Sequence, residues 1–199
     1  MTQPALEPGA SMFDRAMTMW REIDFPLVCE DDPRLASFLE PLRRLYANGR
    51  AIHRRFAIPQ HADFQEFIER GRLHDVFFFG RFWQARSVAA ALPYPPHEPN
   101  LVGHSEFAWT QRVALPGILA TPLVRGGAYE SWNRTDREAM QLGLTAAEVL
   151  LEGDFEEPTV FVSESAWSSF FFDVAWDYTV MVIDAKRRRI EVLLATDTD

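Results

Sequence analysis

The densest runs of apolar and β-branched residues lie near the end of the chain, in segments 178–184 and 189–195. The polar segment 185–188 separates them, and this arrangement predicts an antiparallel hairpin. In the first run, apolar side chains fall on both faces of the expected strand. Because a strand that is apolar on both faces is usually covered on both sides, we expect this hairpin at the centre of the core.

Apolar residues recur at helical spacing in three parts of the N-terminal half, which predicts three amphipathic helices. The segments are 12–20, 35–46 and 63–70. Ser11 is the expected cap of the first helix, and Asp32 followed by Pro33 is a typical start for the second. Pro41 lies inside the second pattern and is expected to kink or divide the helix.

The middle of the chain is rich in aromatic residues and in proline. Segments 75–79 and 81–83 predict a strand interrupted at Gly80, and segment 84–92 predicts a short helix. Four prolines in residues 93–99 predict a stiff, extended connection. This connection either divides two subdomains or forms a surface loop of one domain, and the chain length favours the loop.

Segments 101–114 and 117–124 contain many apolar residues broken by glycine and proline, and we expect short strands there. Further on, Thr135 and Thr145 each precede a glutamate by three positions, which is the spacing of a capping box. Two helices are therefore predicted, at 136–142 and 146–152. An exposed acidic loop over 152–157 and a strand at 158–162 complete the pattern.

These elements predict an α+β fold with one mainly antiparallel sheet, a C-terminal hairpin and several short helices packed on it. Residues 1–10 contain proline and glycine and are expected to form a flexible N-terminus, so the single domain spans 11–199. A chain of 199 residues with 47% hydrophobic and 25% charged residues has the composition of one globular domain.

The net charge of −9 is unevenly distributed. Residues 150–199 contain eleven acids and four bases, a net charge of −7, whereas the rest of the chain carries −2. An acidic surface repels phosphate backbones and favours a basic protein partner, so we expect no nucleic-acid ligand. The alternative is that the acidity serves only solubility.

The sequence contains sixteen phenylalanines, which either fill the core or are partly displayed to a partner; we favour the core. Cys29 is the only cysteine, which excludes an intramolecular disulfide and a multi-cysteine zinc site. Neither a signal peptide nor a long apolar segment is evident. We therefore expect a cytoplasmic protein without a membrane partner.

Few residues suggest catalysis. Asp173 and Asp177, which lie close to the hairpin, could bind a divalent metal and support a small metal-dependent hydrolase. The simpler interpretation is that these aspartates and Asp184 cap or close turns. The five histidines lack metal-binding spacing, and no phosphate-binding loop is present. We predict no cofactor, no metal and no enzymatic activity.

Five arginines between Arg43 and Arg55, with no acid among them, form a second feature of possible chemical interest. Such a cluster could hold a phosphate or an acidic partner. We favour the alternative that these side chains lie at solvated helix ends and form surface pairs with the acidic C-terminal quarter.

Taken together, the chain resembles the immunity proteins that bacteria make against polymorphic or contact-delivered toxins. The resemblance rests on a small, acidic domain rich in Phe and Trp, without a catalytic motif, closing with the hairpin 178–195 and the acidic end 196–199. It implies a monomer that binds a cognate toxin, expected to be basic, and blocks its active site.

The acidic loop 152–157 and exposed aromatic residues near the hairpin are the expected contacts of such a partner, since complementary charge steers binding and aromatic anchors stabilise it. The predicted partner-binding residues are Asp154, Glu156, Glu157, Trp167, Trp176, Asp177 and Tyr178. Besides the hydrolase, the alternative is an adaptor or scaffold that dimerises through the Phe-rich strand expected at 76–83.

Overall fold

The computed structural model describes residues 11–97 and 106–199, and its centre is the predicted C-terminal hairpin. Strands β5 (Tyr178–Asp184) and β6 (Arg189–Thr196) pair antiparallel, and every residue of both strands is buried. The Asp184 carboxylate accepts a hydrogen bond from the backbone N–H of Arg187 and so closes the hairpin turn. The turn-forming role expected for Asp184 is thereby confirmed.

Four further strands extend this hairpin into one antiparallel sheet. They are β1 (Leu27–Glu30), β2 (Arg50–Ala57), β3 (Ala108–Thr110) and β4 (Thr159–Ser163). The strand order is β1-β2-β6-β5-β4-β3. Strands from before and after the proline-rich connection therefore share a single sheet, as expected for one domain.

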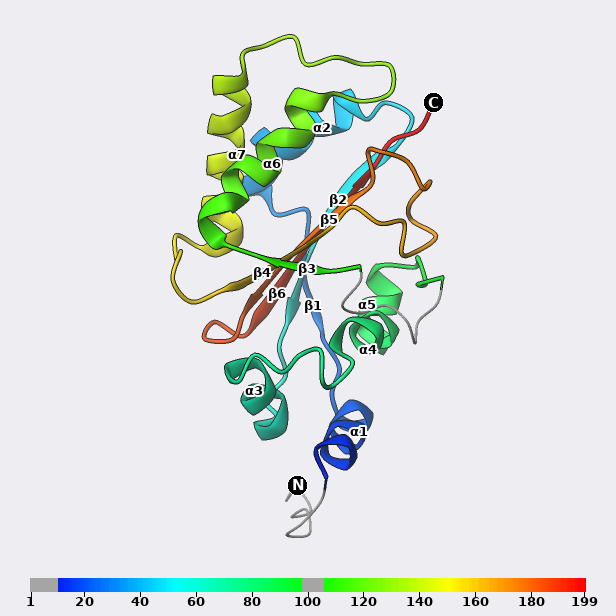
Figure 1. Ribbon diagram of the computed structural model, residues 1–199, viewed down its shortest axis with the longest axis vertical. Coiled ribbons are helices and arrows are strands. Elements are labelled where there is room, and N and C mark those ends of the chain that lie inside the picture. The colour runs from blue at the N-terminus through cyan, green and yellow to red at the C-terminus, as the bar shows by residue number, and fades with distance from the viewer. Residues whose placement is uncertain (1–10, 98–105) are drawn as a thin grey trace.

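Helices cover both faces of the sheet (Figure 1). On one face lie α1 (Met12–Glu22), α3 (Ala62–Glu69), α4 (Phe78–Gln84) and α5 (Arg86–Ala91). On the other face lie α2 (Ala36–Leu45), α6 (Leu115–Arg125) and α7 (Asp136–Leu151). The predicted α+β fold is thus confirmed.

The alternation of side chains along β6 explains why the protein has two cores. Ile190, Val192 and Leu194 point into the core beneath α1, α3, α4 and α5, whereas Leu193 and Ala195 point into the core beneath α2, α6 and α7. A central strand that must fill two cores needs apolar residues on both faces, which is the pattern seen in the sequence.

The N-terminal helices begin where their caps predict. Ser11 accepts a hydrogen bond from the N–H of Asp14 at the start of α1. Asp32 accepts one from the N–H of Arg34 at a 3-10 turn (Pro33–Leu35) that leads into α2. Pro41 lies within α2 without dividing it.

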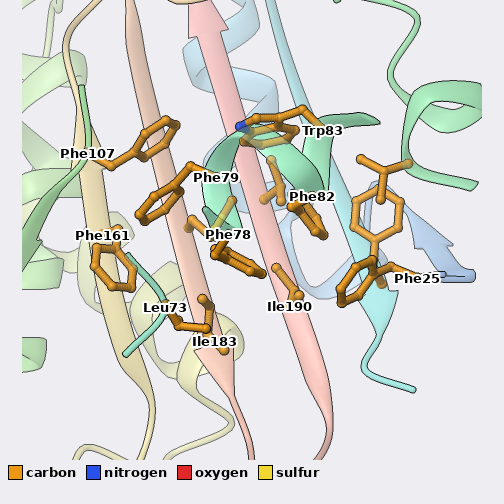
Figure 2. Close-up of a cluster of buried hydrophobic side chains, with 14 of the residues drawn as sticks. Phe25, Leu73, Phe78, Phe79, Phe82, Trp83, Phe107, Phe161, Ile183 and Ile190 are labelled. Atoms are coloured by element: carbon orange, nitrogen blue, oxygen red, sulfur yellow. The ribbon is translucent and has the colours of Figure 1, made fainter. Parts of the chain in front are cut away.

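The aromatic segment predicted as a strand is helical, and that prediction was wrong. Phe78, Phe79, Phe82 and Trp83 all lie on α4 and are buried. Counted from Phe78, the other three follow at one, four and five residues, a spacing that also fits one face of a helix. The frequency of aromatic residues in strands reflects how well they pack there, so aromatic composition alone does not exclude a helix. Figure 2 shows these rings packed over β5 and β6. The dimerisation strand of the adaptor alternative therefore does not exist.

Segment 117–124 is also helical rather than extended. It forms most of α6, in which Leu115, Leu119 and Leu123 are buried at four-residue spacing. Pro116 occupies the first turn, where a missing N–H costs nothing. Of the strands predicted over 101–114, the short β3 is confirmed. The prediction was wrong for residues 112–114, which form a 3-10 turn leading into α6, and residues 98–105 lie outside the described parts of the chain.

One helix, α7, replaces the two predicted between 136 and 152. The capping box at Thr135 and Glu138 is present. Thr145, however, lies inside the helix and donates its hydroxyl hydrogen bond to the carbonyl of Gln141. Gly143 does not end the helix because it lies against α6: a Cβ added there would be 2.2 Å from the carbonyl oxygen of Pro116.

We expect Gly143→Ala to destabilise the protein by about 1–3 kcal/mol, since the added methyl group would force α6 and α7 apart. Gly117→Ala on α6 is a matched control, because its new Cβ would meet only the Met140 side chain at 3.9 Å. The control should leave stability unchanged or raise it by up to about 1 kcal/mol. Urea denaturation measures both, and equal effects would contradict the close helix contact.

Most of the phenylalanines fill the cores: twelve of the sixteen are buried. The expected extended connection is seen up to residue 97, where Pro96 forms an isolated bridge with Ser168. The N-terminal segment 1–10, predicted to be flexible, lies outside the described residues. None of the described helices combines the length and apolar character needed to cross a bilayer.

Candidate functional site

A cavity of about 160 Å³ lies between α6 and the place where β4 ends and β5 begins. We call it the α6–β5 cavity. Its lining is mostly apolar and aromatic, with several hydroxyl groups and one charged residue of each sign. The lining residues are Tyr46, Ile118, Thr121, Pro122, Arg125, Val162, Ser163, Glu164, Trp176, Tyr178 and Thr179.

One face of α6 forms a wall of this cavity. Ile118, Thr121, Pro122 and Arg125 recur at three- and four-residue spacing, which places them on the same side of the helix. Arg125 lies in the last turn, where a cation interacts favourably with the helix dipole. Its guanidinium donates a hydrogen bond to the Ala175 carbonyl and thereby ties α6 to the opposite wall.

The opposite wall is the 172–177 loop, which Asp177 holds in place. The buried Asp177 carboxylate accepts hydrogen bonds from the N–H groups of Phe172 and Val174 and from the hydroxyl of Thr196. With both carboxylate oxygens engaged, the loop is fixed against β6. Trp176, which is half-buried, is consequently held at the cavity.

Two tyrosines contribute phenol groups to the site. Burial raises the pKa of Tyr46, with the Asp197 and Asp177 carboxylates adding to the effect and Arg125 opposing it. Burial also raises the pKa of Tyr178 well above its ordinary value. Both phenols therefore remain protonated at neutral pH. Among the described residues, the Tyr178 hydroxyl has no hydrogen-bond partner.

A second hollow, the α6–α7 groove, lies on the other side of the same helix and has a volume of about 650 Å³. Ile118, Thr121 and Arg125 line both hollows, so α6 separates them as a ridge. Val124 and Met140 are exposed apolar residues that line the groove. The cavity and the groove thus form a continuous, hollowed, largely apolar face.

The seven predicted partner-binding residues do not form one surface. Trp176 and Tyr178 line the cavity at the beginning of β5, whereas Asp154 pairs with Arg187 just beyond the end of this strand. The seven residues of β5 span about 20 Å at roughly 3.3 Å per residue. The acidic loop and the aromatic residues therefore lie at opposite ends of the sheet.

The exposure expected for the aromatic residues was wrong in two cases. Trp167 is 5% exposed, stacks on Trp83 at 4.4 Å and donates its indole N–H to the hydroxyl of Thr179. Tyr178 is 8% exposed. Sequence patterns near a strand end do not reveal that Trp167 packs on α4 or that Tyr178 joins the core beneath α2, α6 and α7. Of the three predicted aromatic contacts, only Trp176 is partly accessible.

In the acidic loop, Asp154 has a structural role. Its carboxylate accepts hydrogen bonds from the N–H groups of Glu156 and Glu157 and pairs with Arg187. These contacts lower the pKa of Asp154 to about 2, with the Arg187 hydrogen bond the main cause. Glu156 and Glu157 remain exposed.

Asp173 and Asp177 do not form the metal site of the hydrolase alternative. Asp177 is engaged by the three donors described above, and Asp173 is exposed with a left-handed backbone φ of 61°. In the parts of the chain described by the structure, no group of three or more His, Cys, Asp and Glu side chains could hold a metal ion. The geometry therefore gives this alternative no support.

The arginine cluster pairs mainly with acids in segment 30–32. Arg43 binds Asp31, Arg54 lies near Glu30, and Arg55 bridges Asp32 and Glu191. The expected pairing with the acidic C-terminal quarter is confirmed for Arg55, which also reaches Glu152, and was wrong for Arg43 and Arg54. These three guanidinium groups are consequently already paired with carboxylates.

A buried histidine extends this network. Nδ1 of His53 accepts a hydrogen bond from the backbone N–H of Asp32, so the ring proton lies on Nε2, which is 2.8 Å from Glu191. His53 and Glu191 are both fully buried. This pair, together with Arg55, joins the chain before α2 to the sheet, and we assign it a structural role.

Glu152 links the same network to the end of α7, and we expect its contribution to depend on pH. A hydrogen bond from Arg34 lowers the pKa of Glu152 from 4.5 to about 2, and Arg189 adds to this against the effect of burial. Since the folded-state pKa is depressed, the stabilisation is present above pH 4.5 and is lost as the pH falls towards 2.

Glu152→Gln should therefore lower stability by about 1–2 kcal/mol at pH 7. The difference between this variant and the wild type should shrink as the pH falls from 4.5 to 2. Urea denaturation over this range measures it, with Glu148→Gln at an exposed position of the same helix as control. A difference that does not change with pH would contradict the assigned ion pair.

Several cavity residues were not predicted as functional. Tyr46 belongs to the apolar stripe of α2 and was interpreted as core, which is also where its ring lies. Ile118 and Thr121 were missed because segment 117–124 was predicted as strands, and Arg125 was missed because the helix that continues to it was not predicted. Reading that segment with a four-residue period would have placed these three side chains on one helical face.

No protein-family model matches this chain, and neither does any curated protein or solved structure.

Proposed function

We propose that this protein is an immunity protein, which binds a toxin domain through the face around the α6–β5 cavity and blocks the toxin's active site. The observation that carries the proposal is the cavity itself, where Tyr, Trp and Arg side chains converge on an apolar hollow. These three residue types dominate the energetic centres of protein interfaces.

Exposed apolar residues around the cavity support a protein partner rather than a small substrate alone. Val124 and Met140 line the adjoining groove, and Val113, just before α6, is 76% exposed. Exposed apolar residues gathered beside a hollow are typical of interaction sites on soluble proteins. A partner that covers both hollows would bury this surface.

The charge of the chain favours a basic toxin. The net charge is −9, and Glu164 lies at the cavity with its side chain 77% exposed. Complementary charge accelerates encounter and disfavours wrong partners. Before binding, the protein is proposed to be a monomer located in the cytoplasm.

The proposal is tested by capture followed by neutralisation. Tagged protein is used to isolate binding proteins from a bacterial lysate, and each captured protein is then expressed with and without this chain. The proposal expects one basic partner that stops growth when expressed alone and is neutralised when co-expressed. A captured partner that is harmless on its own would contradict it.

Two variants locate the binding face. Thr121→Trp places an indole on the ridge between the cavity and the groove, at an exposed position that should not disturb the core. We expect this variant to lose neutralisation. The double variant Glu156→Gln/Glu157→Gln, at the far end of β5, should retain it. The opposite result would place the toxin on the acidic loop.

A further inference from the structure

We infer that the α6–β5 cavity receives one uncharged aromatic ring of the partner and favours a ring with a hydroxyl group, as in a tyrosine side chain. This inference rests on the proposed function, because it names the group that the binding face recognises. It follows from the size of the cavity, the charges around it and the chemistry of its phenols.

The cavity has the size of a single ring. Its volume of about 160 Å³ is close to the roughly 150 Å³ of an apolar protein cavity that accepts benzene. Ile118, Pro122 and Val162 provide aliphatic walls, and Trp176 provides an aromatic one. A two-ring side chain would exceed this space, and a short aliphatic side chain would leave it poorly filled.

The surrounding charges favour neither kind of ion. Arg125 and Glu164 both line the cavity and pair with each other at 3.9 Å, so the lining formed by the described residues offers no unpaired charge of either sign. An ion that entered the cavity would lose hydration without gaining a free partner of opposite charge. A neutral group avoids this cost.

The phenol of Tyr178 accounts for the preferred hydroxyl group. Tyr178 lines the cavity, and its buried hydroxyl has no hydrogen-bond partner among the described residues. A buried polar group without a partner is unfavourable, so a ligand that brings a hydroxyl to it supplies a missing interaction. Since burial keeps this phenol protonated, it can donate to an incoming oxygen.

Free small molecules test the inference without any toxin. The probes are p-cresol, which reproduces the tyrosine side chain, toluene, which reproduces that of phenylalanine, and the ions benzylamine and benzoate. Binding to the full-length protein is followed by amide and indole chemical shifts in NMR titrations. We expect p-cresol to bind about three- to tenfold more tightly than toluene, as one hydrogen bond provides. Both ions should bind more weakly than either.

Three variants make the titration specific. Tyr178→Phe should make the affinities for p-cresol and toluene equal, and Thr121→Trp should weaken both by at least tenfold. Gln141→Trp, an indole at an exposed position of α7 that lines neither hollow, should change neither. The thermal unfolding of each variant shows that the fold is kept.

The inference is overturned if p-cresol does not bind, if either ion binds as tightly as p-cresol, or if Tyr178→Phe leaves the preference intact. In that last case the hydroxyl group of p-cresol would be recognised by a group other than Tyr178. These failures are distinct from failure of the proposed function. A toxin neutralised equally by the wild type and Thr121→Trp would refute the binding face while leaving the titration unchanged.

Discussion

Glu191→Ala is expected to destabilise the protein by about 3–5 kcal/mol, because it removes a buried carboxylate that is the shared partner of buried His53 and partly buried Arg55. Oε1 of Glu191 lies 2.6 Å from the Arg55 guanidinium, and Oε2 lies 2.8 Å from His53. With the carboxylate removed, Arg55 retains Asp32 and the more distant Glu152, whereas the ring proton of His53 faces a space without an acceptor. The loss comes mainly from leaving these buried polar groups unsatisfied.

Chemical denaturation at pH 7 measures this effect. A matched control is Glu40→Ala, which breaks the exposed pair of Glu40 and Arg44 on α2, 3.7 Å apart. Exposed pairs of this kind contribute about 0.3–0.5 kcal/mol. If both variants lost similar stability, the buried network would have no special role in holding the start of α2 on the sheet.

The second large effect is expected in the aromatic core. Phe82 is fully buried on α4, and its ring centroid lies 5.1 Å from that of Phe25 and 4.9 Å from that of Trp83. Truncation to alanine removes these ring contacts and leaves a cavity (Figure 2). We expect Phe82→Ala to cost about 3–5 kcal/mol.

Phe13→Ala provides the comparison, since this phenylalanine on α1 is 56% exposed. Its replacement should change stability by about 0.5 kcal/mol or less. Thermal or chemical unfolding distinguishes the two variants. A small loss for Phe82→Ala would mean that the Phe-rich face of the sheet can repack, contrary to the close ring contacts.

The proposed binding face and the stabilising networks occupy different parts of the same core layer. Glu191 and His53 lie under the segment that precedes α2, whereas the cavity lies between α6 and the start of β5. Variants of the cavity can therefore be tested for binding without removing a buried ion pair. This separation makes the experiments on Thr121 and Tyr178 interpretable.

Local sequence signals correctly predicted those features that depend on residues close together in the chain. Ser11 and Asp32 cap their helices as predicted, because an N-cap depends only on residues within one turn. The C-terminal hairpin was also evident, since its two runs are adjacent in the chain. Its apolar residues on both faces indicated the double-layered packing.

Segments with mixed signals were decided by tertiary contacts. The aromatic run at 78–83 fits either period, and it is helical because its rings fill the space over β5 and β6. Gly143 would ordinarily end a helix. It continues α7 here because α6 approaches so closely that a side chain could not fit.

The candidate site, too, was predicted in part from the sequence and in part determined by tertiary contacts. The sequence by itself placed Trp176 and Tyr178 near the start of the hairpin, and the tertiary structure brought them together with Tyr46, which follows α2, and Arg125 from α6. No pattern in one chain segment encodes that meeting, because it depends on how separate helices cross the sheet. The sequence determined the central hairpin and the helix starts, while packing between distant segments decided the remaining helices and the cavity.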